Sequence, residues 1–186
     1  MKLLTLILTV SFLSACSRPT TDIIESFYNP SPLLTAQSMI GKNERSDRRE
    51  LRAFLGVDPV RYEWCAAFVN ASLYSHGIPG SESVNRNPLM ARSFLTYGTE
   101  ADTPMRGDIV IFPRGNQGWQ GHVGFYIESA HIDGVEYYLI LGGNQDNSVT
   151  YEYYKASKAL AVRRVPDQPS FDSDPTRFDT LLAFVD

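Results

Sequence analysis

The second half of the chain constrains the fold most strongly, because short apolar runs follow one another there at the spacing of β-hairpins. Segments rich in glycine, proline, asparagine and aspartate, which are the residues that turns favour, separate these runs. The expected strands cover residues 108–112, 122–127, 135–141, 149–154 and 160–165. Strands joined by short connections pair in the antiparallel direction. This half therefore predicts an antiparallel sheet of about five strands.

The first half shows apolar residues at helical spacing instead. Helices are expected at residues 33–40, 46–55, 65–75 and 89–97, and one more at 178–185. Helices followed by a run of strands predict an α+β fold, in which N-terminal helices pack on a C-terminal antiparallel sheet. With 186 residues, of which 43% are hydrophobic, the chain is large enough for one globular domain with a core of its own.

The charge of the chain is mild, since 17 basic residues stand against 21 acidic ones and the net charge is −4. A nucleic-acid-binding domain needs a basic face, and no long run of one sign is present to form it. Nucleic acid is therefore excluded as a partner. Four arginines at positions 45, 48, 49 and 52 are expected on the solvated face of the second helix, and contact with an acidic polymer is the less favoured alternative.

The N-terminus has the pattern of a secretory signal. Lys2 precedes an apolar run from Leu3 to Leu13, and small residues follow it. This run is too short to span a bilayer, which takes about 20 apolar residues. Residues 13–16, Leu-Ser-Ala-Cys, resemble the signal of bacterial lipoproteins, which implies a signal peptide over residues 1–15 and a lipid on Cys16. Ordinary secretion with cleavage near Ala15 is the alternative.

Residues 16–32 are polar and contain three prolines, so they are expected to be a lipidated tether without helix. The folded domain is expected to cover residues 33–165. The segment 166–186 is expected to be a C-terminal extension that packs on this domain.

Cys65 is predicted to be a catalytic nucleophile. Lipidation of Cys16 would leave it without a disulfide partner, because the chain has two cysteines. Cys65 begins the expected helix 65–75, and unpaired N–H groups and the helix dipole stabilise negative charge at that end. The thiolate is the form that attacks a carbonyl carbon. The alternative is a buried cysteine that acts as a small apolar residue.

A thiol nucleophile needs a base, and His122 is the predicted one among three histidines. His76 lies 11 residues after Cys65 on the same expected helix, about 16 Å away at 1.5 Å per residue. His131 lies in an expected turn. His122 begins a strand beside Gly121, where a ring can approach another element closely.

The base in turn needs a polar group that orients its ring, and Asn144 is the predicted one. It follows the strand 135–141, whose end returns to the level of His122 if the two strands form a hairpin. Gln145, Asp146 and Asn147 share the same loop, so the assignment stays open among them. Glu63 is expected to point to solvent.

Five further residues are predicted to contact substrate, although each is equally compatible with a place in the core or at its rim. They are Tyr62, Trp64, Gln117, Trp119 and Gln145.

Four blocks in this order, residues 64–70, 106–112, 121–126 and 142–145, resemble those of a CHAP domain. This family comprises cysteine, histidine-dependent amidohydrolases and peptidases, related to the NlpC-like cell-wall endopeptidases. The resemblance implies a papain-like fold and places nucleophile, base and orienting residue at Cys65, His122 and Asn144. It also implies hydrolysis of amide bonds in peptidoglycan, with no metal or organic cofactor.

The sequence thus predicts a monomeric amide hydrolase that works through a thioester. Its expected location is the outer membrane, held by the N-terminal lipid and facing the periplasm, and a protein inhibitor is left open. Two alternatives stand beside it. The same residues can transfer the acyl group to another amine or alcohol instead of water. The chain can also be an envelope lipoprotein that binds without catalysis.

Overall fold

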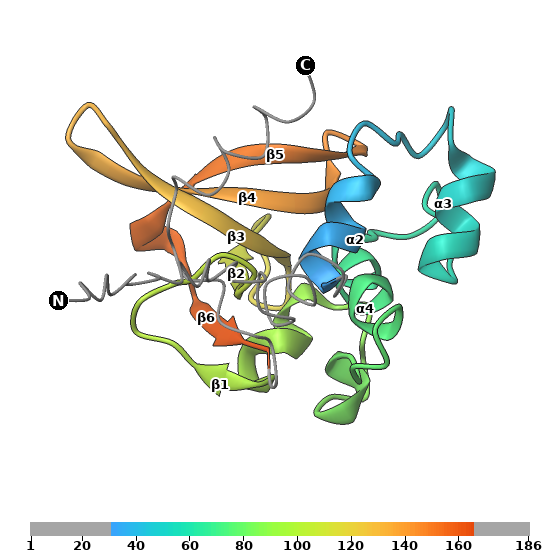
Figure 1. Cartoon of the computed structure of the whole chain (residues 1–186), viewed down its shortest axis with the longest axis horizontal. Helices are drawn as coiled ribbons and strands as arrows, with labels where there is room; N and C mark the ends of the chain where they lie inside the picture. Colours follow the sequence, from blue (N-terminus) through green and yellow to red (C-terminus); the bar gives the residue numbers. More distant parts are fainter. Residues whose placement is uncertain (1–30, 166–186) are drawn as a thin grey trace, which may run out of the picture.

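A computed structural model describes residues 31–165, and the described part consists of three α-helices followed by a six-stranded sheet (Figure 1). The helices are α2 (Pro32–Ser38), α3 (Arg48–Leu55) and α4 (Cys65–Tyr74), and short 3₁₀ helices are η1 (Ser81–Ser83), η2 (Ala91–Thr96) and η3 (Ala156–Lys158). The strands are β1 (Thr99–Glu100), β2 (Ile109–Pro113), β3 (Gly121–Ile132), β4 (Val135–Gln145), β5 (Ser148–Lys155) and β6 (Ala161–Arg164). The predicted α+β class is confirmed.

The sheet has the strand order β1-β6-β2-β3-β4-β5, and all of its pairs are antiparallel. Two-residue turns connect β3 to β4 and β4 to β5. Both residues of each turn have positive φ: 50° and 74° at Asp133 and Gly134, and 49° and 62° at Asp146 and Asn147. Two-residue turns of this kind match the twist of the flanking strands, which explains the long hairpins.

The sheet differs from the sequence prediction in one added edge strand and in the length of two inner strands. Strand β1 has two residues, too few to show an alternating pattern, and it pairs with β6. Strands β3 and β4 extend beyond the expected 122–127 and 135–141, because the tight turn at Asp133 lets the pairing continue. The expected helix at 89–97 is the shorter 3₁₀ helix η2, which buries Phe94.

Helix α2 begins inside the segment that the sequence assigned to the tether. Pro32 occupies the first turn of the helix, and the side chain of Ser31 accepts a hydrogen bond of 3.3 Å from the N–H of Leu34. Proline is favoured at this position because its missing N–H would have no helical partner there. Pro32 therefore starts a helix and does not interrupt one.

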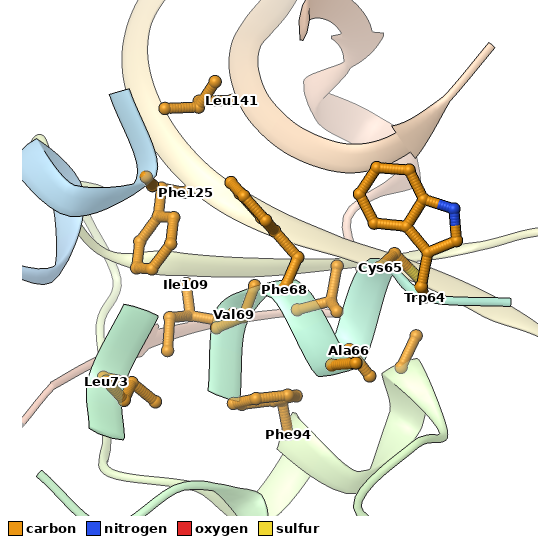
Figure 2. Close-up of a cluster of buried hydrophobic side chains, with 14 of the residues drawn as sticks. Trp64, Cys65, Ala66, Phe68, Val69, Leu73, Phe94, Ile109, Phe125 and Leu141 are labelled. Carbon is orange, nitrogen blue, oxygen red and sulfur yellow. The ribbon is translucent and has the colours of Figure 1, made fainter. Parts of the chain in front are cut away.

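Helix α4 forms the centre of the core. Every residue from Cys65 to Leu73 is buried, because the helix contacts β3 and β4 on one side and α2 and α3 on the other. A helix that is apolar on all sides is expected where neighbours surround it completely. Figure 2 shows Phe68, Val69 and Leu73 along this helix among Phe94, Ile109 and Phe125.

The end of β4 approaches α4 so closely that it has no room for a side chain. A Cβ atom on Gly143 would lie 2.5 Å from Cζ3 of Trp64 and 2.7 Å from Cβ of Phe68. These distances are too short for carbon atoms in contact. The glycine thus sets how near the start of α4 lies to the sheet.

Several predictions fall outside the described residues. They are the signal peptide over 1–15, the lipid on Cys16, most of the tether, and the C-terminal extension with its helix at 178–185. Between residues 31 and 165 no helix is long and apolar enough to cross a membrane.

Replacing Gly143 with alanine should destabilise the protein. The new methyl group must displace Trp64 or Phe68, so we expect the free energy of unfolding to fall by about 1–3 kcal/mol. Thermal unfolding measures the change. Gly118→Ala is the matched control, because a Cβ there meets no atom within 4 Å. Equal melting temperatures for the two variants would contradict the close approach.

Candidate active site

Cys65 is the first residue of α4 and lies against the start of β3, as the sequence predicted for its place in the helix. Its sulfur accepts hydrogen bonds from the backbone N–H groups of Val123 and Ala66. Val123 directly follows His122, so the sulfur lies against the segment of β3 that carries the predicted base. Cys65 is a free cysteine and 3% exposed.

The surroundings of Cys65 favour the neutral thiol in the resting protein. Burial raises its pKa, and this effect outweighs the nearby Arg114 guanidinium and the two backbone N–H groups, which lower the pKa. The neighbouring Glu63 carboxylate adds a smaller increase. The position of Cys65 at the start of a helix predicted that the thiol ionises more easily. That prediction did not include the effect of burial on the pKa.

His122 is fully buried at the start of β3. Its Nε2 lies 2.9 Å from Oε1 of Gln145, and its ring stacks on Tyr154 with centroids 5.3 Å apart. The pKa of His122 is lowered to about 3, chiefly by burial and also by the Arg114 charge, and the bond to Gln145 opposes both effects. The imidazole is therefore neutral at physiological pH.

The hydrogen bonds of Gln145 determine which nitrogen of His122 carries the proton. The amide nitrogen of Gln145 lies 2.6 Å from the carbonyl oxygen of Thr150, which can only accept. Its Oε1 must then face His122, so His122 donates from Nε2. The lone pair of a neutral imidazole is consequently on Nδ1.

Nδ1 of His122 is buried and has no hydrogen-bond partner among residues 31–165. Buried polar atoms without a hydrogen-bond partner are rare in folded proteins, so each one calls for an explanation, and a catalytic role is one such explanation. An acceptor of this kind beside a neutral thiol is the arrangement that a base needs to take the thiol proton.

Gln145, and not Asn144, contacts His122. The side chain of Asn144 donates instead to Oε2 of Glu63, at 2.6 Å. In a regular strand Asn144 would share the face of Gly142, which points toward His122. Asn144 has a left-handed backbone with φ of 58°, and the pairing of β4 with β5 is irregular between Gly142 and Gln145. This irregularity turns Gln145 to the side of His122.

Gly142 leaves the space that this hydrogen bond occupies. A Cβ atom there would lie 2.7 Å from Oε1 of Gln145 and 3.0 Å from Nε2 of His122. The two glycines of the pair thus serve opposite faces of β4: Gly142 makes room for the His122–Gln145 bond and Gly143 for the start of α4.

Arg114 is a site residue that the sequence argument missed. It follows β2, the partner of β3, and its guanidinium donates to the backbone oxygen of Asn144 at 3.1 Å. It also lies 3.8 Å from Oε2 of Glu63. Its charge lowers the pKa of both Cys65 and His122. The signal that could have identified Arg114 is its position directly after β2, because this end of β2 pairs with Gly121 at the start of β3.

The residues predicted to contact substrate divide into two groups. Tyr62, Gln117 and Trp119 are exposed, so their contact with substrate stays a prediction. Trp64 is fully buried and its ring nitrogen donates to Oε2 of Glu44 at 3.3 Å, so it belongs to the core. Gln145 is buried and contacts His122. Glu63 is exposed, as expected, although it contacts Asn144 and Arg114.

A cavity of about 410 Å³ adjoins the site. Two of its lining residues belong to the surroundings of His122, namely Arg114 and Tyr154. No group of three or more histidine, cysteine, aspartate or glutamate side chains within residues 31–165 is placed to hold a metal ion. What the site combines is a thiol, a neutral imidazole with a free lone pair, and a nearby guanidinium.

A comparison of the chain with protein-family models finds one matching family. Residues 57–144 match the CHAP domain, a span that includes Cys65, His122 and Asn144 and ends one residue before Gln145. Among curated proteins, none matches the chain.

Removing the amide of Gln145 should disturb His122 far more than removing that of Asn144. Gln145→Leu leaves the Nε2–H of His122 and the oxygen of Thr150 buried without this partner, which should lower the free energy of unfolding by about 1–3 kcal/mol. Asn144→Gly is the matched control, because glycine adopts the same left-handed backbone. Thermal unfolding and the imidazole nitrogen resonances of His122 report the effect. A larger change in Asn144→Gly would contradict the contact seen here.

Arg114→Gln should raise the pKa of the Cys65 thiol, because it removes the nearby positive charge. At a fixed pH below this pKa we expect alkylation by iodoacetamide to slow, because a smaller fraction of the thiol is ionised. Arg114→Lys keeps the charge and should react nearly as fast as the unaltered protein. Identical pH profiles for the glutamine variant and the unaltered protein would show that Arg114 does not act on the thiol.

Proposed function

Because residues 57–144 form a CHAP domain, a domain of amidohydrolases and peptidases that act on peptidoglycan, we propose that this chain is a cysteine-dependent peptidoglycan amide hydrolase. The observation that carries the proposal is the free Nδ1 lone pair of His122 beside the neutral thiol of Cys65. A neutral thiol and a neutral imidazole are the protonation states that a nucleophile and its base have before reaction.

The reaction begins when the sulfur of Cys65 attacks the amide carbon and its proton passes to Nδ1 of His122. The resulting thiolate and imidazolium stabilise one another. Their attraction compensates for the cost of burying each charge alone. The backbone N–H groups of Val123 and Ala66 and the Arg114 guanidinium stabilise the sulfur as it loses its proton. Attack turns the carbonyl oxygen into an oxyanion, and the N–H of Cys65 at the helix start is placed to donate to it.

The second half of the reaction releases the two products. His122 gives the proton from Nδ1 to the leaving amine, and the carbon–nitrogen bond breaks to leave a thioester on Cys65. A water molecule then attacks the thioester while His122 takes its proton, and the free acid and the thiol are formed. Throughout, Gln145 holds Nε2 of His122, so that the ring presents Nδ1 to the sulfur. Gln145 thus takes the positioning role that sequence reasoning assigned to Asn144.

The N-terminal pattern supports a location for this activity. We propose that the signal over residues 1–15 is removed, that Cys16 is lipidated, and that the enzyme is held at the outer membrane facing the periplasm. The apolar run from Leu3 to Leu13 and the Leu-Ser-Ala-Cys sequence carry this part of the proposal. Lipid chains contribute about 0.8 kcal/mol per buried CH₂ group, so several of them would keep the enzyme close to the polymer that it cuts.

Cys65→Ala and His122→Ala should each abolish hydrolysis of purified peptidoglycan, by roughly a thousandfold or more. Mass spectrometry of the soluble fragments measures the loss and identifies the bond that is cut. His131→Ala is the matched control, because His131 is an exposed residue on the same strand and should be dispensable. Circular dichroism verifies that the variants are folded. Undiminished turnover by Cys65→Ala would refute the proposal.

A further inference from the structure

A second cavity, of about 600 Å³, lies between helix α3 and the segment that leads to Cys65. Its lining combines arginines with apolar side chains and one carboxylate: Arg48, Arg52, Gly56, Val57, Asp58, Arg61, Tyr62 and Leu89. The sequence predicted that the arginines of α3 are mainly solvated. They are exposed, as predicted, and Arg48 and Arg52 also line this cavity, together with Arg61 from the following loop.

The charges in this cavity do not balance. Arg48 forms a two-point contact with Asp58, in which its Nε lies 2.9 Å from Oδ1 and a second guanidinium nitrogen bonds to Oδ2. Arg61 lies 3.6 Å from Oδ2, and the charge of Arg52 also acts on the same carboxylate. The contact with Arg48 lowers the pKa of Asp58 to about 2, so its single negative charge persists at physiological pH. Three guanidinium groups therefore share one carboxylate, and the cavity carries two excess positive charges.

The three arginines of this cavity differ in how firmly they are paired. Arg48 is held in place by Asp58, whose side chain is largely buried. Arg61 is 76% exposed and approaches Asp58 only loosely, and Arg52 is exposed as well. Guanidinium groups recognise carboxylates through paired hydrogen bonds, and an incoming carboxylate would find two such groups turned to solvent.

One residue that lines the cavity is close to Cys65 in the chain. Tyr62 lines it and precedes Cys65 by three residues, so their Cα atoms are at most about 11 Å apart. An extended peptide covers that distance with about three residues. A substrate whose amide bond lies at Cys65 can thus extend its neighbouring residues into the cavity, against the apolar side chains of Tyr62, Val57 and Leu89.

We propose that this cavity is an anion subsite, in which Arg52 and Arg61 bind a free carboxylate of the substrate peptide about two or three residues from the bond that is cut. The inference rests on the proposed function, because it takes the peptide stems of peptidoglycan, which carry free carboxylates, as the substrate. It makes the enzyme selective for acidic stems over stems whose carboxylates are amidated.

The test compares two synthetic stem-peptide substrates that differ only in a carboxylate or a carboxamide. In Arg52→Gln and Arg61→Gln we expect the KM for the acid to rise about tenfold each, which is the loss of one charge-assisted hydrogen bond. The KM for the carboxamide should change little, and kcat should be similar for both. Arg49→Gln is the matched control, because Arg49 is exposed on the same helix and does not line the cavity.

A binding measurement separates failure of the subsite from failure of the proposed function. Calorimetry with the Cys65→Ala chain and the acid peptide requires no turnover. If the unaltered enzyme cuts neither peptide while this binding still depends on Arg52 and Arg61, the subsite stands and the reaction assignment fails. If the enzyme cuts both peptides and the two arginine variants retain the KM values of Arg49→Gln, the subsite is refuted. Arginine-dependent binding to vesicles of anionic phospholipid, with peptide kinetics unchanged, would likewise overturn the assignment to substrate.

Discussion

The burial of helix α4 from Cys65 to Leu73 is the constraint on which the rest of the structure depends. A ten-residue helix with neighbours on every side fixes the position of its first residue, since any shift would disturb packing against the sheet and against α2 and α3. The first residue is Cys65, and the contact of Trp64 and Phe68 with Gly143 sets its distance from the sheet. A reactive group on a rigid element is positioned more accurately than one on a loop.

Burial of this kind has an electrostatic consequence, because it opposes charge on both members of the Cys65–His122 pair. The thiol has a raised pKa and the imidazole a lowered one, so the resting protein keeps the proton on sulfur. An ion pair forms only when both partners become charged together. Gln145 and Thr150 determine the tautomer of His122, which leaves the lone pair of its neutral ring on Nδ1.

The fold class was accessible from the sequence, because it depends on periodic patterns, and residue type and position selected Cys65 and His122 as candidates whose catalytic roles stay a prediction. Hairpin spacing and helical spacing predicted the α+β class, and the isolated Cys65 and the strand-initial His122 were identified by their positions. The orienting residue was not accessible. Its identity depends on a left-handed residue at Asn144, which reverses the alternation of β4, and alternation alone assigns the neighbouring position to the wrong face. Arg114 was missed because its role arises from strand pairing between β2 and β3. The arginines of α3 are exposed, as predicted, but a helical pattern could not show that two of them line a cavity, because it does not show what lies opposite the polar face.

The contact among Glu63, Asn144 and Arg114 gives the site a property that its buried members do not have. Glu63 is 82% exposed at its side chain and lies 3.8 Å from Arg114, so the pair faces water at the rim of the site. Mobile ions screen such exposed charges within about 8–10 Å at physiological ionic strength, whereas they do not reach the bond between His122 and Gln145. A change in ionic strength would then alter the electric field at the site without altering its structure. Salt would change how strongly the rim attracts or repels an approaching charged group, while the alignment of sulfur and imidazole would remain the same.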